Sequence, residues 1–136
     1  MKLLLDSSAI IEFLRGNQKV REVMGNADSL YTSPICTYEV LVGEKYNELR
    51  GIGSSYQRAL GIFAKTKMLH LTSSNARSAA EITARLMLNG TKVNDLDVLI
   101  ASQALSIGAV VLTTNVKHFE AIKEITDLPI EKILMH

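Results

Sequence analysis

Four acidic side chains and one amide are the groups with which this sequence could carry out chemistry: Asp6, Glu39, Asp95, Asp97 and Asn115. Carboxylates brought close together repel one another, and binding of a divalent cation relieves that repulsion. Because the candidate ligand atoms are all oxygens, the cation would be a hard one, Mg²⁺ or Mn²⁺, rather than zinc. These residues therefore predict an acidic metal site, provided that the fold brings them together.

The elements that must position these residues are short apolar strands alternating with helices. We expect strands at 3–5, 29–32, 68–71, 109–113 and 129–133, and helices at 8–14, 18–25, 34–49, 56–65, 72–88, 98–105 and 119–125. This alternation is typical of an α/β fold, a three-layer sandwich with a central parallel sheet flanked by helices. Ligands of such folds bind beyond the carboxyl ends of the strands. Asp6 and Asn115 follow two of the predicted strands, so the expected site lies at that edge.

The composition fits one globular domain over residues 1–136. Fifteen Lys and Arg against 14 Asp and Glu give a net charge of +1, which argues against a strongly basic nucleic-acid-coating protein. The single cysteine, Cys36, excludes an internal disulfide and a cysteine-based metal cluster. Asp6 ends the first apolar run too early for a signal peptide, and no run approaches the ~18 apolar residues of a membrane span. We expect a soluble, cytoplasmic protein.

Each candidate ligand also has a purely structural interpretation. Asp6, Asp95 or Asp97 could simply cap the helix that follows it, because short oxygen side chains accept hydrogen bonds from the free N–H groups of a first turn. Glu39 could be an ordinary solvated residue on its helix. Asn115 could merely serve the turn after its strand. Spacing alone leaves both interpretations open for each residue.

Other polar and sulfur-containing residues receive smaller roles. Ser7 and Thr114 are expected to be caps or hydroxyls that support the ligands. Cys36 is expected to be a buried small hydrophobe. The three histidines show no ligand spacing, and we expect none of them in the site: His70, His118 and His136.

Four stretches of the chain carry a further pattern, and each contains one or two of the candidate ligands. They are LDSSAIIEFLRG (5–16), TYEVLVG (37–43), NDLDVLIASQA (94–104) and VLTTNVKHF (111–119). In order and separation they resemble the four motifs of the PIN-domain family, especially its VapC-type toxins. The resemblance spans nearly the whole chain, and it implies a PIN-like fold.

The resemblance implies a metal-dependent endoribonuclease that acts as the toxin of a toxin–antitoxin pair. The family's acids fall on Asp6, Glu39 and Asp97, which would be the catalytic residues and would hold Mg²⁺ or Mn²⁺. Asp95 is a nearby extra acid that joins the site or caps the helix. The fourth position, commonly aspartate in the family, is Asn115 here, whose amide oxygen could ligate without adding charge. Water activated by the metal would cleave RNA, leaving a 5′-phosphate and a 3′-hydroxyl.

The same resemblance implies protein partners: a cognate antitoxin and a second copy of the chain in a homodimer. The apolar helix 8–14 and the stripe Tyr38, Val42 and Tyr46 are candidate surfaces for them. The alternative is that both simply pack in the core.

Two other functions remain open. A phosphoacceptor domain of the receiver type also gathers acids at strand ends, but it would need a lysine at a late strand end, where this chain has Thr113, Thr114 and Asn115. A catalytically weak or silent binding module of the PIN-like fold is the second alternative, in which Asn115 marks the decay of the site.

Overall fold

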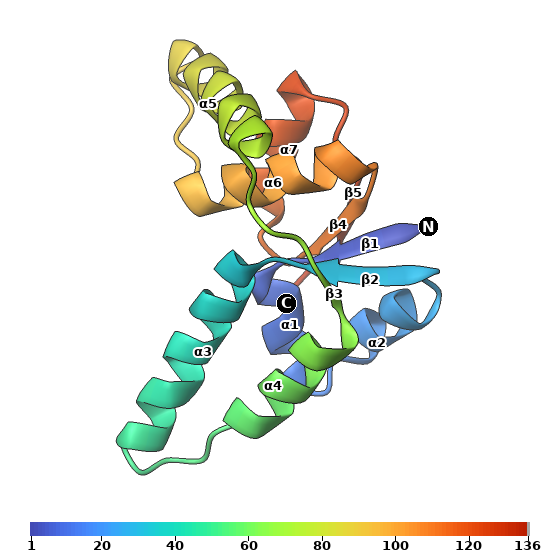
Figure 1. Cartoon of the computed structure of the whole chain (residues 1–136), viewed down its shortest axis with the longest axis vertical. Coiled ribbons are helices and arrows are strands. Elements are labelled where there is room, and N and C mark those ends of the chain that lie inside the picture. Colours follow the sequence, from blue (N-terminus) through green and yellow to red (C-terminus); the bar gives the residue numbers. More distant parts are fainter. Residues whose placement is uncertain (136) are drawn as a thin grey trace.

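The computed structural model describes residues 1–135, which form a five-stranded sheet with helices on both faces (Figure 1). The strands are β1 (Lys2–Leu5), β2 (Ser29–Thr32), β3 (Lys67–Met68), β4 (Val110–Thr113) and β5 (Ile130–Lys132). The helices are α1 (Ser7–Leu14), α2 (Gln18–Gly25), α3 (Pro34–Leu49), α4 (Tyr56–Lys65), α5 (Ser73–Leu88), α6 (Asp95–Ile107) and α7 (Val116–Ile125). The predicted α/β sandwich with a parallel central sheet is confirmed.

The sheet is parallel throughout, in the order β3-β2-β1-β4-β5. Figure 1 shows α1 to α4 on one side of the sheet and α5 to α7 on the other. The chain leaves β1 toward the first layer and leaves β4 toward the second, although these two strands are neighbours. Ligands of a parallel sheet bind where the connections from two neighbouring strands go to opposite faces of the sheet, as they do here. We therefore expect the ligand crevice of this protein beyond Leu5 and Thr113, and we call this place the crevice.

The layers bury β1 and α6 most completely. Leu3, Leu4 and Leu5 of the central strand are fully buried, as expected for a strand covered on both faces. Helix α6 buries almost its whole length from Asp97 to Ala104, so the prediction of a buried helix after the two acids is confirmed. Because most of α6 is buried, the position of the helix is fixed, and so is the position of Asp97 in its first turn.

The apolar stripe of α3 does not pack in the core, which was one of the two alternatives left open by the sequence. Its buried residues are Cys36 and Val40, whereas Tyr38, Val42 and Tyr46 are 68%, 51% and 58% exposed. The three residues do lie on one side of the helix, but that side faces outward, because α3 packs on the rest of the protein along the opposite side. The expected burial of Cys36 is confirmed.

Helix α1 shows the reverse outcome for the other candidate interaction surface. Ala9, Ile10 and Leu14 are buried in the core, so most of its apolar side is already covered within the chain. Of the two surfaces offered by the sequence, only the stripe on α3 is available to another protein.

The strand β3 is shorter than the predicted strand 68–71. Leu69 still donates its N–H to the carbonyl of Thr32, at 2.9 Å, but its own carbonyl accepts from the Gln103 side chain of α6, at 2.7 Å. A side chain thus takes the place of the next sheet hydrogen bond, and the chain turns toward the Thr72 cap of α5. Within residues 1–135, no helix combines the length and apolar character needed to cross a membrane.

Candidate active site

Asp6 is fixed at the point where β1 ends and α1 begins. Its backbone N–H donates to Leu112 of the neighbouring strand, at 3.2 Å, which continues the sheet pairing by one residue. Its side chain caps α1: Oδ1 accepts from the backbone N–H of Ala9, at 2.8 Å, and from the hydroxyl of Ser8, at 2.7 Å. The structural interpretation as a helix cap is therefore correct, and the cap uses Oδ1.

The second oxygen of Asp6 points toward β4. Thr113, the last residue of that strand, donates its hydroxyl to Oδ2 at 2.5 Å and accepts the backbone N–H of Asn115 at 2.8 Å. Thr113 thus connects the ends of the two neighbouring strands. The sequence expectation assigned a supporting hydroxyl to Thr114, but the hydrogen bond of Thr114 in this region is made by its backbone N–H, to Ser8.

Burial makes the charged form of Asp6 costly. The side chain is almost entirely removed from water, and this desolvation raises the pKa of Asp6 from 3.8 to about 6. Three hydrogen bonds to the carboxylate act in the opposite direction, and the negative charge of Asp97 raises the pKa further. A cation beside Asp6 would remove both penalties, because it stabilises the charged form and separates the two acids electrostatically.

Asp97 lies in the first turn of α6 and is tied to the start of α7. Its Oδ2 accepts from Asn115 Nδ2 at 2.8 Å and lies 2.9 Å from His118 Nδ1. Since a carboxylate oxygen only accepts, this contact assigns the imidazole proton to Nδ1 when Asp97 is ionised. Two donors on one oxygen hold the carboxylate in place and direct its other oxygen, Oδ1, elsewhere.

His118 is the residue of this cluster that the sequence analysis missed, because no second histidine lies at a ligand spacing. The signal that could have found it is its distance along the chain from Asn115. Residues three apart lie on the same face of a helix, so a side chain near the start of α7 and another three positions later meet the same neighbour. The two side chains indeed lie 3.0 Å apart.

Glu39 approaches the crevice from α3. The Ser7 hydroxyl, in the first turn of α1, donates to Glu39 Oε1 at 2.6 Å. Glu39 is half-buried, so it is not the freely solvated helix residue of the structural interpretation. Ser7 is the residue that links Glu39 to the segment carrying Asp6.

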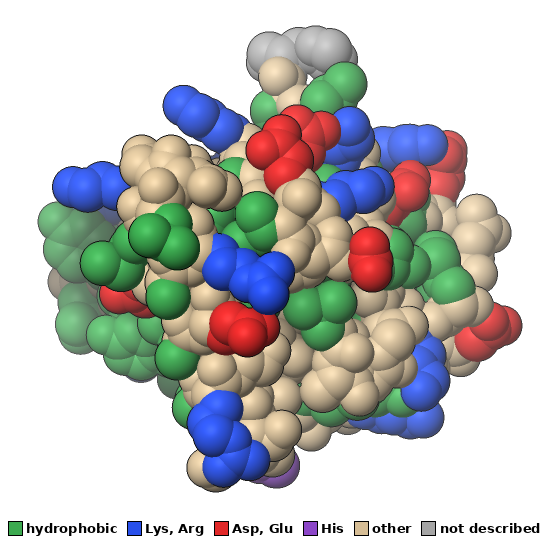
Figure 2. Space-filling model, turned by 90° about the horizontal axis from the view of Figure 1, so that it is seen from above, with side chains coloured by type: hydrophobic (Ala, Val, Ile, Leu, Met, Phe, Trp, Pro, Cys, Tyr) green, Lys and Arg blue, Asp and Glu red, His purple; other side chains and the backbone are tan. Residues whose placement is uncertain are grey.

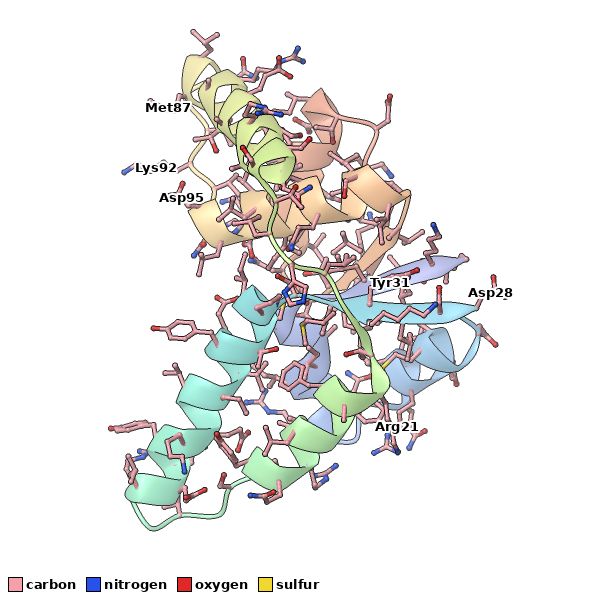
Figure 3. The ribbon with its side chains drawn as sticks, viewed as in Figure 1. Arg21, Asp28, Tyr31, Met87, Lys92 and Asp95 are labelled. Carbon is pink, nitrogen blue, oxygen red and sulfur yellow. The ribbon has the colours of Figure 1, made fainter. Side chains whose placement is uncertain are left out.

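Asp95 does not join Asp97. The cap of α6 is Asn94, whose Oδ1 accepts from the backbone N–H of Leu96 at 2.8 Å. Asp95 is exposed and lines a separate pocket at the end of α5, and Figure 3 shows it on the same side of the molecule as Met87 and Lys92. Neither acid of this turn is the helix cap, and only Asp97 belongs to the cluster with Asn115.

The donor chemistry of the crevice fits a hard cation. Among the hydrogen bonds that the structure describes, none uses Asp97 Oδ1, Glu39 Oε2 or Asn115 Oδ1. The Asn115 side chain does not cap α7 either. Each of these side chains is therefore anchored by one atom and presents an oxygen that can bind a cation. Within residues 1–135, however, no three His, Cys, Asp or Glu side chains are gathered closely enough to hold a metal ion.

Most of the chain matches a known protein family. The family described as "PIN domain" matches residues 3–125. "Ribonuclease VapC19" of Mycobacterium tuberculosis is 27% identical over 120 residues, covering 85% of this chain and 90% of that protein. The "tRNA(fMet)-specific endonuclease VapC" of Salmonella typhimurium is 28% identical over 126 residues, with 90% and 92% covered.

Solved structures give the same answer for the fold. The chain resembles one in the DNA-bound VapBC of Salmonella typhimurium with a TM-score of 0.79 and 27% identity, covering 97% and 98% of the two chains. VapBC2 of Rickettsia felis gives a TM-score of 0.80 at 21% identity, over 98% and 99% of the chains. With a family match over residues 3–125, this chain belongs to the PIN-domain family.

Proposed function

We propose that this protein is a Mg²⁺- or Mn²⁺-dependent endoribonuclease that acts as the toxin of a toxin–antitoxin pair. The observation that carries the proposal is the cluster of Asp6, Asp97 and Asn115 at the strand ends, in which Asp97 Oδ1 and Asn115 Oδ1 make no hydrogen bond among the described residues and the charged form of Asp6 is destabilised by burial. The relatives named ribonuclease and tRNA(fMet)-specific endonuclease support RNA as the substrate.

The residues that would hold the cation are Asp6, Asp97 and Glu39, with the amide oxygen of Asn115 as a neutral fourth ligand. A bound Mg²⁺ or Mn²⁺ supplies a water of lowered pKa and stabilises negative charge on the leaving oxygen. Asp6 contributes a desolvated carboxylate whose charged form a cation would stabilise. Asn115 and His118 hold Asp97 Oδ2, so that Oδ1 is the oxygen left to bind a cation.

Glu39 completes the ligand set from the opposite side of the crevice. Ser7 holds its Oε1 and leaves Oε2 for the cation. Since the described side chains do not already surround one point, binding must draw Glu39 toward Asp6 and Asp97. A glutamate near the middle of α3 has the side-chain length for such an adjustment, whereas the shorter Asp6 is fixed by its cap.

RNA binding needs positive charge around this acidic centre. Removing the four candidate acids from the 14 of the chain leaves ten acids against 15 bases, a balance of +5. Figure 2 shows acidic and basic side chains interspersed on the face above α5 and α7. That face therefore offers no continuous basic surface, and we expect the RNA phosphates to be bound around the mouth of the crevice.

The expected partners are an antitoxin and a second copy of the chain. Structures similar to this one were solved as VapBC assemblies. An apolar surface on α3 and the start of α4 is available for the antitoxin: Tyr38, Leu41, Val42, Tyr46, Leu49 and Tyr56 line an open hollow there. Contiguous exposed apolar surface of this kind is typical of a protein–protein interface. Since α3 also carries Glu39, an antitoxin bound along it would reach the active site.

Cleavage of single-stranded RNA by the purified protein tests the proposal. We expect cleavage with Mn²⁺ or Mg²⁺ and none with a chelator, and restoration when the metal is added back. The variant Asp6→Asn should remove this activity, while the matched control Asp127→Asn, at an exposed position, should keep it. Metal-independent cleavage would contradict the proposal, and a folded protein that binds but never cleaves RNA would favour the silent binding module.

A further inference from the structure

A second pocket opens beside the candidate active site, between the end of α5 and the start of α6. Its volume is about 450 Å³, within the usual range for sites that bind small organic groups. Met87, Lys92 and Asp95 line it, and Figure 3 shows these labelled residues on one side of the molecule. The function proposed above makes no use of this pocket, although it contains Asp95.

His118 joins this pocket to the candidate active site. It lines the pocket, and its Nδ1 lies 2.9 Å from Asp97 Oδ2. A ligand in the pocket therefore sits one side chain away from a carboxylate that we assign to the metal. An RNA strand whose phosphate is held at the crevice can place a neighbouring base in the pocket without leaving the surface.

The lining of the pocket matches a nucleobase rather than an apolar ligand. Val98 and Leu86 form a buried apolar base, and Met87 supplies exposed apolar surface at the side. Flat bases exposed from a single strand can pack against apolar side chains such as these, and their edges are read by hydrogen bonds from polar groups. Lys92, which is exposed at the same pocket, provides a positive charge for a phosphate.

The polar groups at the pocket favour one base. Asp95 offers two acceptor oxygens, and no hydrogen bond to them exists among the described residues. Asn94 has already used its Oδ1 as the cap of α6, so its side chain offers the donor Nδ2. A base that places one carbonyl beside two adjacent N–H donors complements this pair. Guanine is that base, since O6 accepts and N1–H and the 2-amino group donate.

We propose that the pocket between α5 and α6 binds a guanine of the RNA substrate, adjacent to the phosphate that is cleaved. Asp95 accepts from N1–H and the 2-amino group, Asn94 donates to O6, and the apolar wall packs against the ring. This inference rests on the proposed function, because it assigns a base preference to the same RNA. It gives Asp95 a part in recognition of the substrate instead of in metal binding.

The experiment compares short single-stranded RNAs that differ at one position, which is guanine, inosine or adenine. With the native protein and Mn²⁺, we expect kcat/KM to be highest for guanine, lower for inosine, which lacks the 2-amino group, and lowest for adenine. The variant Asp95→Asn should lose roughly tenfold on the guanine RNA, since an amide has only one acceptor oxygen where the carboxylate has two. The preference between guanine and inosine should disappear. The control Glu22→Gln, at an exposed site on α2, should keep it.

A binding measurement separates this inference from the proposed function. The same RNAs are titrated against the Asp6→Asn protein, which cannot cleave, and binding is followed by fluorescence anisotropy. Tighter binding of guanine than of inosine, lost on adding Asp95→Asn, supports the pocket even if the native protein proves inactive. Equal binding of all three RNAs, or a guanine preference that survives Asp95→Asn, would overturn the inference whatever the outcome of the cleavage assays.

Discussion

The acids on the two sides of the crevice differ in how many hydrogen bonds hold them and in how deeply they are buried. On one side, Asp6 and Asp97 each accept at least two hydrogen bonds from neighbours in the fold, and Asp6 is nearly inaccessible to water. On the other side, Glu39 is half-buried and receives a single hydrogen bond, from Ser7. The first side is assembled before any ligand binds, whereas the second is held by one contact and is free to adjust.

This difference follows from where the candidate residues lie in the fold. Asp6 and Asn115 follow neighbouring strands, so the sheet register brings them together without further help. Glu39 lies near the middle of α3, well beyond the end of β2, so its side chain must reach back to the crevice. In the function proposed above, Asp6 and Asp97 would give a cation a fixed reference, and Glu39 would adjust to it. Changes on the two sides should therefore differ in their effect on stability as well as on activity.

Of the site variants, the largest effect is expected from Asp97, and its neighbour Asp95 in the first turn of α6 provides the contrast. Asp97→Asn should reduce RNA cleavage by roughly 10²–10³-fold, because it removes a charge from the group that stabilises the reacting phosphate. Asp95→Asn should reduce it by about tenfold or less, through the base contact proposed above. Initial rates at saturating Mn²⁺ give the comparison. If Asp95→Asn proved the more damaging change, the assignment of the third acid would be wrong.

On the opposite side, Glu39→Gln should lower cleavage by roughly 10²-fold, whereas Ser7→Ala should lower it by about tenfold, since a residue that only positions a ligand has the smaller effect. The Ser7→Ala defect should be reduced by raising the Mn²⁺ concentration, because Glu39 is still present. The control is Glu48→Gln on the same helix, whose ion pair with Lys45 is exposed. A Glu39→Gln protein with normal activity would remove α3 from the site.

Stability in a chelator should depend on pH through Asp6. Unfolded Asp6 loses its proton near pH 3.8, but the native residue has a pKa of about 6. Between these values the native state holds a proton that the unfolded state has lost. The contribution of Asp6 to the free energy of unfolding should therefore fall by about 3 kcal/mol as the pH rises through this window, and stay low above it.

The variant Asp6→Asn isolates this effect, because the amide carries no charge at any of these pH values. Urea unfolding at pH 4 and pH 7.5 should show a smaller difference for Asp6→Asn than for the native protein. The exposed control Asp127→Asn should behave like the native protein. An unchanged pH dependence in Asp6→Asn would mean that its burial does not carry this cost.

The smallest effect is expected at Asn115. Asn115→Ala removes its hydrogen bond to Asp97 and should lower the stability of the metal-free protein by about 1 kcal/mol. Asn115→Asp should destabilise it more, because a second carboxylate would face Asp97, and Mn²⁺ should then restore a larger part of the melting temperature. Melting curves over a range of Mn²⁺ concentrations measure both changes. Identical Mn²⁺ responses in all three proteins would place Asn115 outside the metal site.

The sequence predicted the fold and most of the crevice because these depend on local patterns. Apolar runs followed by caps located the strand ends, and the sheet then brought Asp6 and Asn115 together. The contact of His118 with Asp97 could not be predicted in the same way, since it depends on how α7 packs against α6. The outward direction of Tyr38, Val42 and Tyr46 was also hidden, because periodicity shows that a helix has an apolar side but not what covers it.

The sequence pattern also could not show which of the two acids, Asp95 or Asp97, faces the crevice. Both acids open the same helix, and residues two apart on a helix point in different directions. Which of the two faces the crevice depends on the rotation of α6 about its axis, and that rotation is set by the burial of the helix further along. The resemblance to the PIN-domain family selected Asp97, and the contacts with Asn115 and His118 place Asp97 in the cluster.

The central claim is that the acidic cluster cleaves RNA through water activated by a bound metal, and the ends of the RNA products test it most directly. Hydrolysis by water leaves a 5′-phosphate and a 3′-hydroxyl, whereas attack by the 2′-hydroxyl of the RNA itself leaves a 2′,3′-cyclic phosphate. Mass spectrometry of the products of a defined RNA distinguishes the two. We predict 5′-phosphate ends that form with Mn²⁺ and are absent with a chelator or with Asp6→Asn. Cyclic phosphate ends that form in the chelator and disappear in His118→Ala would contradict the account, because the histidine and not the carboxylates would then carry the reaction.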